Sequence, residues 1–207
     1  MSACYSKSDV PETKIELSGF EKILVLPFKN LTMQYGENGI IRCPACGTAF
    51  AAGKVTEASG HLMTEHLLSF LRNNTHFKIV SSHRPITAQS ESFTSSAPVF
   101  AEQEILVSAA RAAETDWVLA GYIFRYKQRI GTQYSVQSPA SVAFSLHLIG
   151  AVDGKSIWYG HYDETQQSLS ENLFRLKKFL KRKWKWIKAE EMAISGLEEL
   201  LKTFPMP

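Results

Sequence analysis

The chain has 207 residues, 44% of them hydrophobic, which is enough to bury one sizeable core. No apolar run approaches the roughly 20 residues needed to span a bilayer. The net charge of +3 conceals a local excess, because residues 175–188 hold eight of the 23 Lys and Arg residues. The rest of the chain therefore has 15 basic residues against 20 acidic ones, and its basic character belongs to one segment.

The N-terminal stretch 1–19 is polar and contains Pro11 and Gly19, as expected of a flexible tether. Ser2 and Ala3 precede Cys4, and a polar tail follows, as at the processing site of a bacterial lipoprotein. We expect Cys4 to be lipidated and a signal peptide to precede it in the native precursor. The alternative is an ordinary free cysteine near a disordered end.

A short apolar run at 21–28 predicts a central strand that ends at Pro27 or just beyond. The stretch 30–53 carries four glycines and two cysteines, so we expect a long loop or a small excursion from the core there.

A helix is predicted at 55–73, because Met63, Leu67 and Leu71 fall on one compact apolar face. The next elements are expected in this order: a short strand at 77–80, a Ser/Thr/Pro-rich loop at 83–100 and a helix at 102–114.

The longest β pattern of the chain lies at 116–166, where three strands are predicted. Residues 140–148 alternate apolar and small or polar side chains, which predicts a strand with one buried face. Asp153 and Gly154 indicate a two-residue hairpin turn. Such a turn places His147 and His161 on opposite faces of the sheet, as ordinary strand residues.

The element order predicts an α/β fold with a single mixed β-sheet, parallel in its first half and an antiparallel hairpin in its second, flanked by helices. Apolar stripes predict C-terminal helices at 171–204. We therefore expect one α/β domain at 20–207 behind the tether.

Cys43 and Cys46 form the sharpest local motif, Cys-Pro-Ala-Cys-Gly. With His61 and His66 they approach the spacing of a two-Cys, two-His zinc site. Two histidines five positions apart on a helix point about 140° away from each other, which weakens that pairing. A local disulfide or structural thiol pair, a zinc site completed by other ligands and a redox-active thiol pair are the alternatives.

No nucleophile elbow, dinucleotide fingerprint or phosphate-binding loop occurs in the sequence, and we assign no catalytic residue. Arg125, Lys127 and Arg129 alternate with aromatic residues, a pattern also found on nucleic-acid-binding surfaces. We interpret it as a strand with one solvated basic face, and expect no nucleic-acid partner.

Four segments together resemble a group of bacterial envelope proteins. The group comprises the TolB amino-terminal domain and the curli-secretion and penicillin-binding-protein-activator lipoproteins. The resembling segments are ILVLPFKNLT at 23–32, HLMTEHLLSFLRNNTHFKIVSS at 61–82, AARAAETDWVLAGYI at 109–123 and LHLIGAVDGKSIWYG at 146–160. They correspond to the group's first strand, a helix running into a strand, a helix entering a strand, and a hairpin.

The resemblance implies an exported α/β protein, often lipidated, that binds or assembles with other proteins of the cell envelope. The proteins of this group are not known as enzymes, which implies a role without catalysis, and the oligomeric state stays open. Tyr5, rather than Asp, follows Cys4, which favours the periplasmic face of the outer membrane. The alternative is a cytosolic protein, metal- or thiol-dependent, that uses Cys43 and Cys46. No cofactor is expected apart from zinc at that pair.

The segment RLKKFLKRKWKWIK at 175–188 is a second candidate for membrane contact. A basic helix with Trp at its polar–apolar border can lie on an anionic bilayer. Alternatively, Leu176, Leu180, Trp184 and Ile187 dock on the sheet while the charges remain solvated. The residues proposed to face lipid headgroups are Arg175, Lys177, Lys178, Lys181, Arg182, Lys183, Lys185 and Lys188.

This segment predicts that the purified protein binds anionic vesicles but not neutral ones, because each Lys or Arg near such a surface adds about 1 kcal/mol. Binding should fade as salt rises, since the Debye length falls from about 10 Å at 0.1 M to about 3 Å at 1 M. Replacing Lys177, Lys181, Lys183 and Lys185 by Gln should abolish binding in a flotation assay without lowering the melting temperature. Equal binding by variant and parent would make the segment an ordinary solvated surface.

Overall fold

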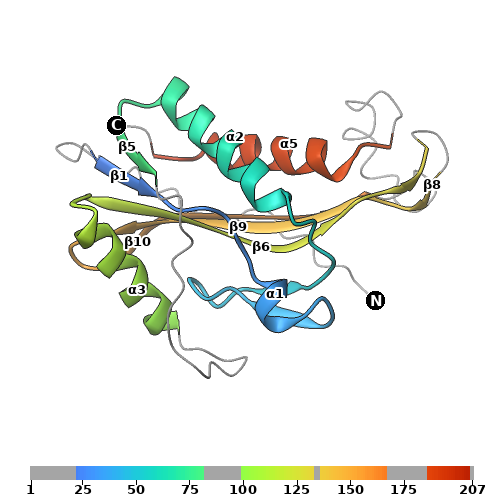
Figure 1. Ribbon diagram of the computed structural model, residues 1–207, viewed down its shortest axis with the longest axis horizontal. Helices are drawn as coiled ribbons and strands as arrows, with labels where there is room; N and C mark the ends of the chain where they lie inside the picture. The colour runs from blue at the N-terminus through green and yellow to red at the C-terminus, as the bar shows by residue number, and fades with distance from the viewer. Residues whose placement is uncertain (1–21, 82–98, 133–135, 167–185, 206–207) are drawn as a thin grey trace.

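The computed structural model describes residues 22–81, 99–132, 136–166 and 186–205, and a central β-sheet runs through them (Figure 1). The main path of the sheet has the order β10-β9-β6-β1-β5. These strands are β1 (Lys22–Val25), β5 (Lys78–Ser81), β6 (Trp117–Lys127), β9 (Ser141–Gly150) and β10 (Ser156–Thr165).

The sheet is mixed, as the sequence predicts. Strand β1 lies parallel to both β5 and β6, whereas β6, β9 and β10 are antiparallel in turn. The chain interrupts pairing near Pro27 and resumes it at β2 (Lys29–Asn30), which pairs with β6. Proline has no amide hydrogen to donate, so a break in the ladder at this point is expected.

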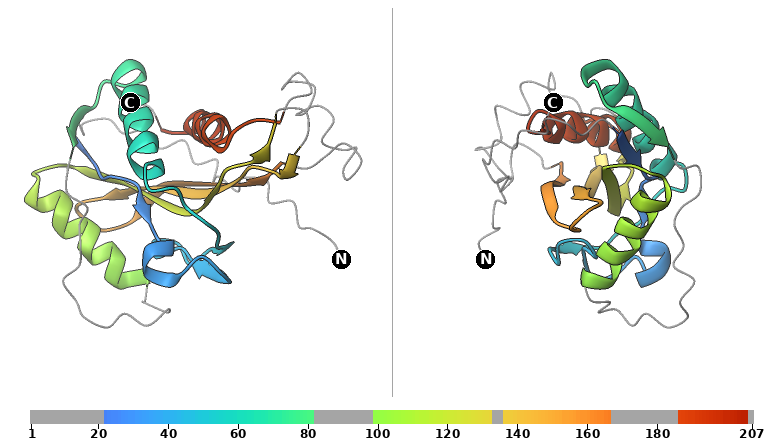
Figure 2. Two further views of the ribbon diagram at one scale, coloured as in Figure 1. Left: turned by 45° about the vertical axis from the view of Figure 1, so that its right-hand side comes forward. Right: turned by 90° about the vertical axis from the view of Figure 1, so that its left-hand side faces the viewer.

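One face of the sheet is covered by α2 (Ser59–Asn74) and α5 (Ala189–Leu201) (Figure 2). Met63, Leu67 and Leu71 of α2 are buried there, as their spacing predicts. The helix begins at Ser59 rather than at the predicted position 55, because Val55 forms a bridge with Tyr126 of the sheet.

The predicted C-terminal helices are observed only in part. Helix α5 begins at Ala189, and residues 186–188 before it are not helical. The remainder of the predicted first helix, residues 171–185, lies outside the described residues.

The opposite face of the sheet is covered by α3 (Val99–Ala112), the short helix α1 (Thr32–Tyr35) and a small antiparallel hairpin. The hairpin consists of β3 (Ile40–Arg42) and β4 (Ala49–Ala51) and arises from the stretch expected to be a loop or excursion. Helix α3 begins at Val99, so the last two positions of the predicted loop at 83–100 are helical.

Strand β9 is buried along its entire length, on both faces. Its even-numbered apolar residues are buried, as predicted, and pack under α2 and α5. The prediction of a single buried face is wrong, because Ser145 and His147 are also buried, on the side of α3 and the β3–β4 hairpin. A polar residue in a strand usually marks a solvated face, but here a second covering layer lies over it.

The predicted two-residue turn at Asp153 and Gly154 is also wrong. Five residues, 151–155, join β9 to β10, and the turn is closed by a hydrogen bond from Gly150 N to Lys155 O of 3.0 Å. A register shift near Ser156 then pairs His147 with Tyr159 and His161 with Ser145. Tyr159 and His161 are two positions apart, so His147 and His161 share a face of the sheet rather than lying on opposite faces.

Arg125 is not part of a solvated basic face, in contrast to the prediction. Its guanidinium donates to Ala51 O of β4 at 2.7 Å and to Ser141 Oγ of β9 at 2.5 Å, and it pairs with Asp163 of β10. The side chain therefore ties the β3–β4 hairpin to three strands of the sheet.

Two further strands, β7 (Ile130–Gly131) and β8 (Val136–Ser138), pair beyond β6 as a second small hairpin.

Among the described helices, none has the length and apolar character needed to cross a bilayer.

Gly196 allows α5 to pack closely against the sheet without a break in the helix. A methyl group at this position would lie 2.7 Å from the ring of Tyr162 in β10. Gly196→Ala should lower the free energy of unfolding by about 1–3 kcal/mol through overpacking, although Ala is the better helix former by about 1 kcal/mol. Urea denaturation measures this change.

Ser195→Ala is the matched control, because Ser195 is the exposed neighbour on the same helix. Its free energy of unfolding should stay within about 0.5 kcal/mol of the parent. A Gly196→Ala protein as stable as its parent would contradict the close packing.

Candidate functional site

The β3–β4 hairpin positions the two cysteines through a tight turn. Cys43 N donates to Thr48 O at 2.8 Å, and Gly47 N donates to Cys43 O at 2.8 Å. Gly47 has a φ of 75°, a conformation that glycine adopts without steric cost. Phe50 of β4 stacks on Phe124 of β6 at a centroid distance of 4.0 Å, which holds the hairpin against the sheet.

This placement brings the cysteines to the central strand β9. Cys43 and His147 are each only 1% exposed, and Cys43 Sγ lies 3.2 Å from His147 Nε2. Cys46 is exposed at the outer side of the same cluster. The ligand atoms of Cys43, Cys46 and His147 all lie within 4.8 Å of one another.

Ser145 extends the polar contacts of the cluster. Its hydroxyl lies 3.4 Å from Cys43 Sγ and 3.0 Å from His147 Nε2. On the outer side, Cys46 Sγ and Thr48 Oγ1 are 3.2 Å apart. The two sulfurs therefore lie between the buried polar residues of β9, Ser145 and His147, and the solvent.

The two thiols differ in acidity. A hydrogen bond from the Cys43 thiol lowers the pKa of Cys46 to about 3, and the His147 imidazole acts in the same direction. Burial raises the pKa of Cys43 well above its ordinary value, and the adjacent Cys46 raises it further. The pair thus holds a thiolate at Cys46 and keeps a proton on Cys43, a combination suited to metal ligation or to thiol chemistry.

Aromatic rings enclose His147 on two sides. Tyr159 stacks on the imidazole at 6.3 Å between centroids, and Tyr122 lies tilted against it at 5.9 Å. His147 Nδ1 is buried and has no hydrogen-bond partner among the described residues. A buried polar atom without a partner is uncommon and calls for an explanation.

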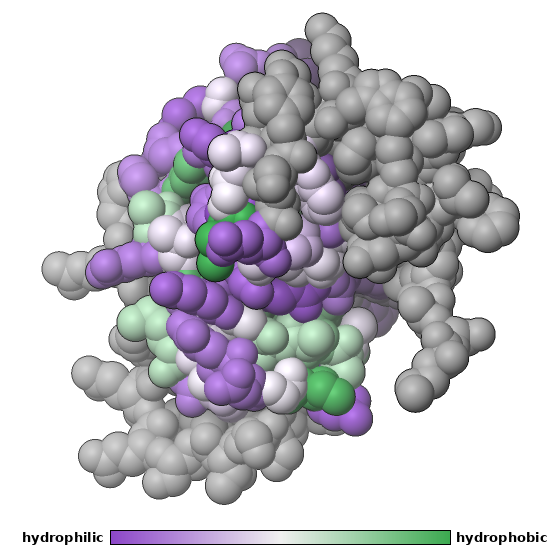
Figure 3. Space-filling view, turned by 90° about the vertical axis from the view of Figure 1, so that its right-hand side faces the viewer, coloured by the Kyte–Doolittle hydropathy of each residue, from purple (hydrophilic) through white to green (hydrophobic). Residues whose placement is uncertain are grey.

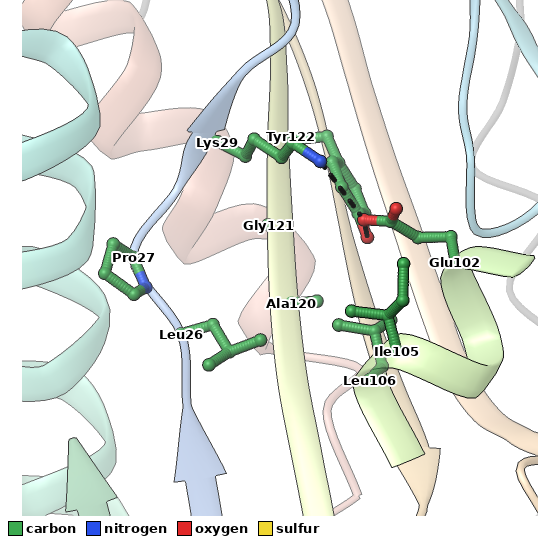
Figure 4. A pocket seen from close by; sticks show the side chains of 9 residues that line it. All are labelled: Leu26, Pro27, Lys29, Glu102, Ile105, Leu106, Ala120, Gly121 and Tyr122. Atoms are coloured by element: carbon green, nitrogen blue, oxygen red, sulfur yellow. Dashed lines mark hydrogen bonds and ion pairs between the residues drawn. The ribbon is translucent and has the colours of Figure 1, made fainter. Parts of the chain in front are cut away.

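Tyr122 links the cluster to a small pocket between the sheet and α3 (Figure 4). Its hydroxyl donates to Glu102 Oε1 at 2.9 Å, and Lys29 Nζ lies 3.5 Å from the same oxygen. Burial, with the charge of Glu102, raises the pKa of Tyr122 well above its ordinary value. Tyr122 therefore remains a neutral hydrogen-bond donor at the polar end of this pocket.

The structure brings Cys43 and Cys46 together but does not bring His61 and His66 to them. Both histidines are exposed on α2, which packs on the opposite face of the sheet. Lys188 is exposed immediately before α5. The other predicted site residues lie outside the described residues: Cys4 and the basic positions 175–185.

Sequence reasoning missed His147 as the partner of the cysteines. It lies 104 positions from Cys43, so no local spacing connects them. The available signal was two polar residues, Ser145 and His147, in a strand that is otherwise mostly apolar. Ser145 and His147 lie on the same face of β9, and the cysteine pair lacked further ligands in the sequence. Together these two facts indicate that the cysteines could cover this face.

No sequence profile of a protein family matches the chain, and no curated protein sequence is similar to it. Solved structures do match. PelC from Paraburkholderia phytofirmans, a dodecamer, superposes with a TM-score of 0.55 at 13% identity, over 97% of this chain and 99% of PelC. At this identity the similarity establishes the fold, and it extends over nearly the full length of both chains.

Two further solved structures match at lower scores. The LpoB C-terminal domain from Salmonella enterica has a TM-score of 0.39 at 15% identity, over 71% of this chain and 84% of that domain. Lipoprotein GNA1162 from Neisseria meningitidis has a TM-score of 0.40 at 15% identity, over 78% of this chain and 91% of that lipoprotein. The similarity to PelC confirms the α/β fold that the sequence predicts.

The different acidity and exposure of the thiols predict selective alkylation in the reduced, metal-free protein. Cys46 should react with iodoacetamide much faster than Cys43, which is 1% exposed. With its pKa lowered to about 3, Cys46 should keep its rate from about pH 7 to about pH 5, whereas an ordinary thiol of pKa near 8.5 loses about 100-fold. Peptide mass spectrometry measures each site, with glutathione as the reference thiol. Equal rates at the two cysteines would contradict this arrangement.

Proposed function

We propose that the protein is a lipoprotein of the bacterial cell envelope that acts as a binding and assembly component rather than an enzyme. It is tethered to the periplasmic face of the outer membrane through a lipid on Cys4. Its α/β domain associates with further copies of itself and with other envelope proteins. The tether of about 16 residues allows the domain to reach partners some distance from the membrane.

The observation that carries this proposal is the similarity to PelC over nearly the full length of both chains. PelC is a dodecamer, so a chain with this fold is able to form a large assembly. The processing-site pattern before Cys4 and the resemblance of four segments to envelope lipoproteins support the compartment.

Exposed apolar side chains support an assembly role. Met33 of α1 and Ile40 of β3 are 86% and 74% exposed. Figure 3 shows pale-green apolar residues grouped below a band of hydrophilic ones, in the layer that holds α1 and the β3–β4 hairpin. Grouped apolar surface of this kind is typical of a protein–protein contact.

A second candidate function is metal- or thiol-dependent chemistry in the cytosol. The cluster of Cys43, Cys46 and His147 favours it, because two sulfurs and an imidazole within 4.8 Å form a reactive or metal-binding group. The compartment separates the candidates, since a cytosolic protein would carry no lipid on Cys4.

The proposal predicts that the protein produced from its own gene in its own bacterium fractionates with the outer membrane. Extracted in mild detergent, it should run as a homo-oligomer in size-exclusion chromatography with light scattering. Cys4→Ser should move the protein out of the membrane fraction, because the lipid is lost, while the oligomer persists. Ile40→Glu should dissociate the oligomer, because a charge replaces an exposed apolar contact.

Cys46→Ser is the control for Cys4→Ser, since it removes an exposed cysteine elsewhere in the chain and should leave the protein in the membrane fraction. A monomer at micromolar concentration would contradict the assembly role. A Cys4→Ser protein that remains in the membrane fraction would contradict the tether.

A further inference from the structure

We propose that Cys43, Cys46 and His147 bind a zinc ion, which fastens the β3–β4 hairpin to the central strand β9. The inference does not depend on the proposed function, because the three residues meet within one chain. It differs from the spacing-based zinc site, which would use His61 and His66 of α2.

The geometry of the cluster fits a tetrahedral site. Zinc bonds of about 2.3 Å to sulfur and about 2.0–2.1 Å to nitrogen place neighbouring ligand atoms roughly 3.5–3.8 Å apart. Cys43 Sγ and His147 Nε2 are 3.2 Å apart, and all three ligand atoms lie within 4.8 Å. Small side-chain adjustments therefore suffice to place one ion between them.

The turn that carries the cysteines is already shaped for ligation. The β3–β4 ladder and the hydrogen bonds of the turn hold the segment that carries Cys43 and Cys46, and β9 holds His147 next to Cys43. Ligands held by regular elements lose little conformational freedom when a metal binds.

A disulfide between the cysteines does not explain His147. A local disulfide requires no imidazole, yet His147 lies 1% exposed with Nε2 beside Cys43 Sγ and with Nδ1 unpartnered among the described residues. Burying an imidazole with an unmade hydrogen bond costs free energy. A metal–nitrogen bond at Nε2 would give this buried imidazole a role that a local disulfide does not, while Nδ1 has no partner among the described residues in either case.

The donor set selects the class of metal. Two thiolates and one imidazole are soft and borderline ligands, which favour zinc over the oxygen-seeking magnesium and calcium ions. Binding would release the thiol proton of Cys43 to the solvent, since the coordinating form is the thiolate. Among the described residues no fourth protein ligand joins the cluster, so the exposed side near Cys46 leaves one position for water.

The experiment uses the reduced, untagged full chain, first without metal and then titrated with Zn2+. Native mass spectrometry should show one zinc ion per chain, and Co2+ should give thiolate-to-cobalt charge-transfer and tetrahedral visible bands. His147→Gln and Cys46→Ser should each weaken zinc binding by at least about 100-fold, because even outer-sphere partners of a ligand contribute roughly 10- to 100-fold. Zinc should raise the melting temperature of the parent but not of these variants.

The matched control is the double variant His61→Gln and His66→Gln, which alters exposed histidines on the opposite face and should bind zinc like the parent. If His147→Gln does not fold, Cys46→Ser, at an exposed position, still tests the site. Undiminished zinc binding by either folded ligand variant overturns the proposal. So does a parent that takes up no zinc, or protein from its own compartment that lacks two hydrogens and carries no metal.

Discussion

Strand β9 is buried on both faces, and the arrangement of the other elements follows from this constraint. Its even-numbered residues need an apolar cover, which α2 and α5 supply. Its other face carries Ser145 and His147, so the second cover must offer polar partners as well as apolar contacts. The β3–β4 hairpin meets both needs, because Phe50 stacks on Phe124 while Cys43 reaches the polar pair. Contacts of this kind lower the free-energy cost of burying polar groups.

The two covers divide the molecule by chemical character. The α2 and α5 side is an apolar core of the usual kind, held by close packing such as that of Gly196 on Tyr162. The hairpin side holds the two cysteines and, at its surface, exposed apolar residues such as Ile40. An ion bound at the cysteines would therefore fix the same hairpin whose outer surface we propose for assembly. Arg125 holds this hairpin from a second point through Ala51 and Asp163.

Local pattern was sufficient to predict much of the fold, including the mixed sheet and the apolar face of α2 around Met63, Leu67 and Leu71. It failed where tertiary contacts decide. The turn at Asp153 and Gly154 is widened by hydrogen bonds that close at Gly150, and the resulting register puts His147 and His161 on one face. Cys43 and Cys46 were identified from their spacing, but His147 was not, because its role depends on a hairpin packed over β9. His61 and His66 follow the cysteines at a spacing that fits a zinc site, but they lie on α2, on the opposite side of the sheet from the cysteines.

The most direct test of this account is carbethoxylation of the histidines in the reduced, metal-free native protein, followed by peptide mass spectrometry. His61 and His66 are exposed on α2 and serve as internal references. If the hairpin covers β9, His147, at 1% exposure, should remain unmodified until the protein unfolds in urea, whereas the two references react at once. Modification of His147 in the folded protein at the rate of His61 would show that this face of β9 is open, and would contradict the account.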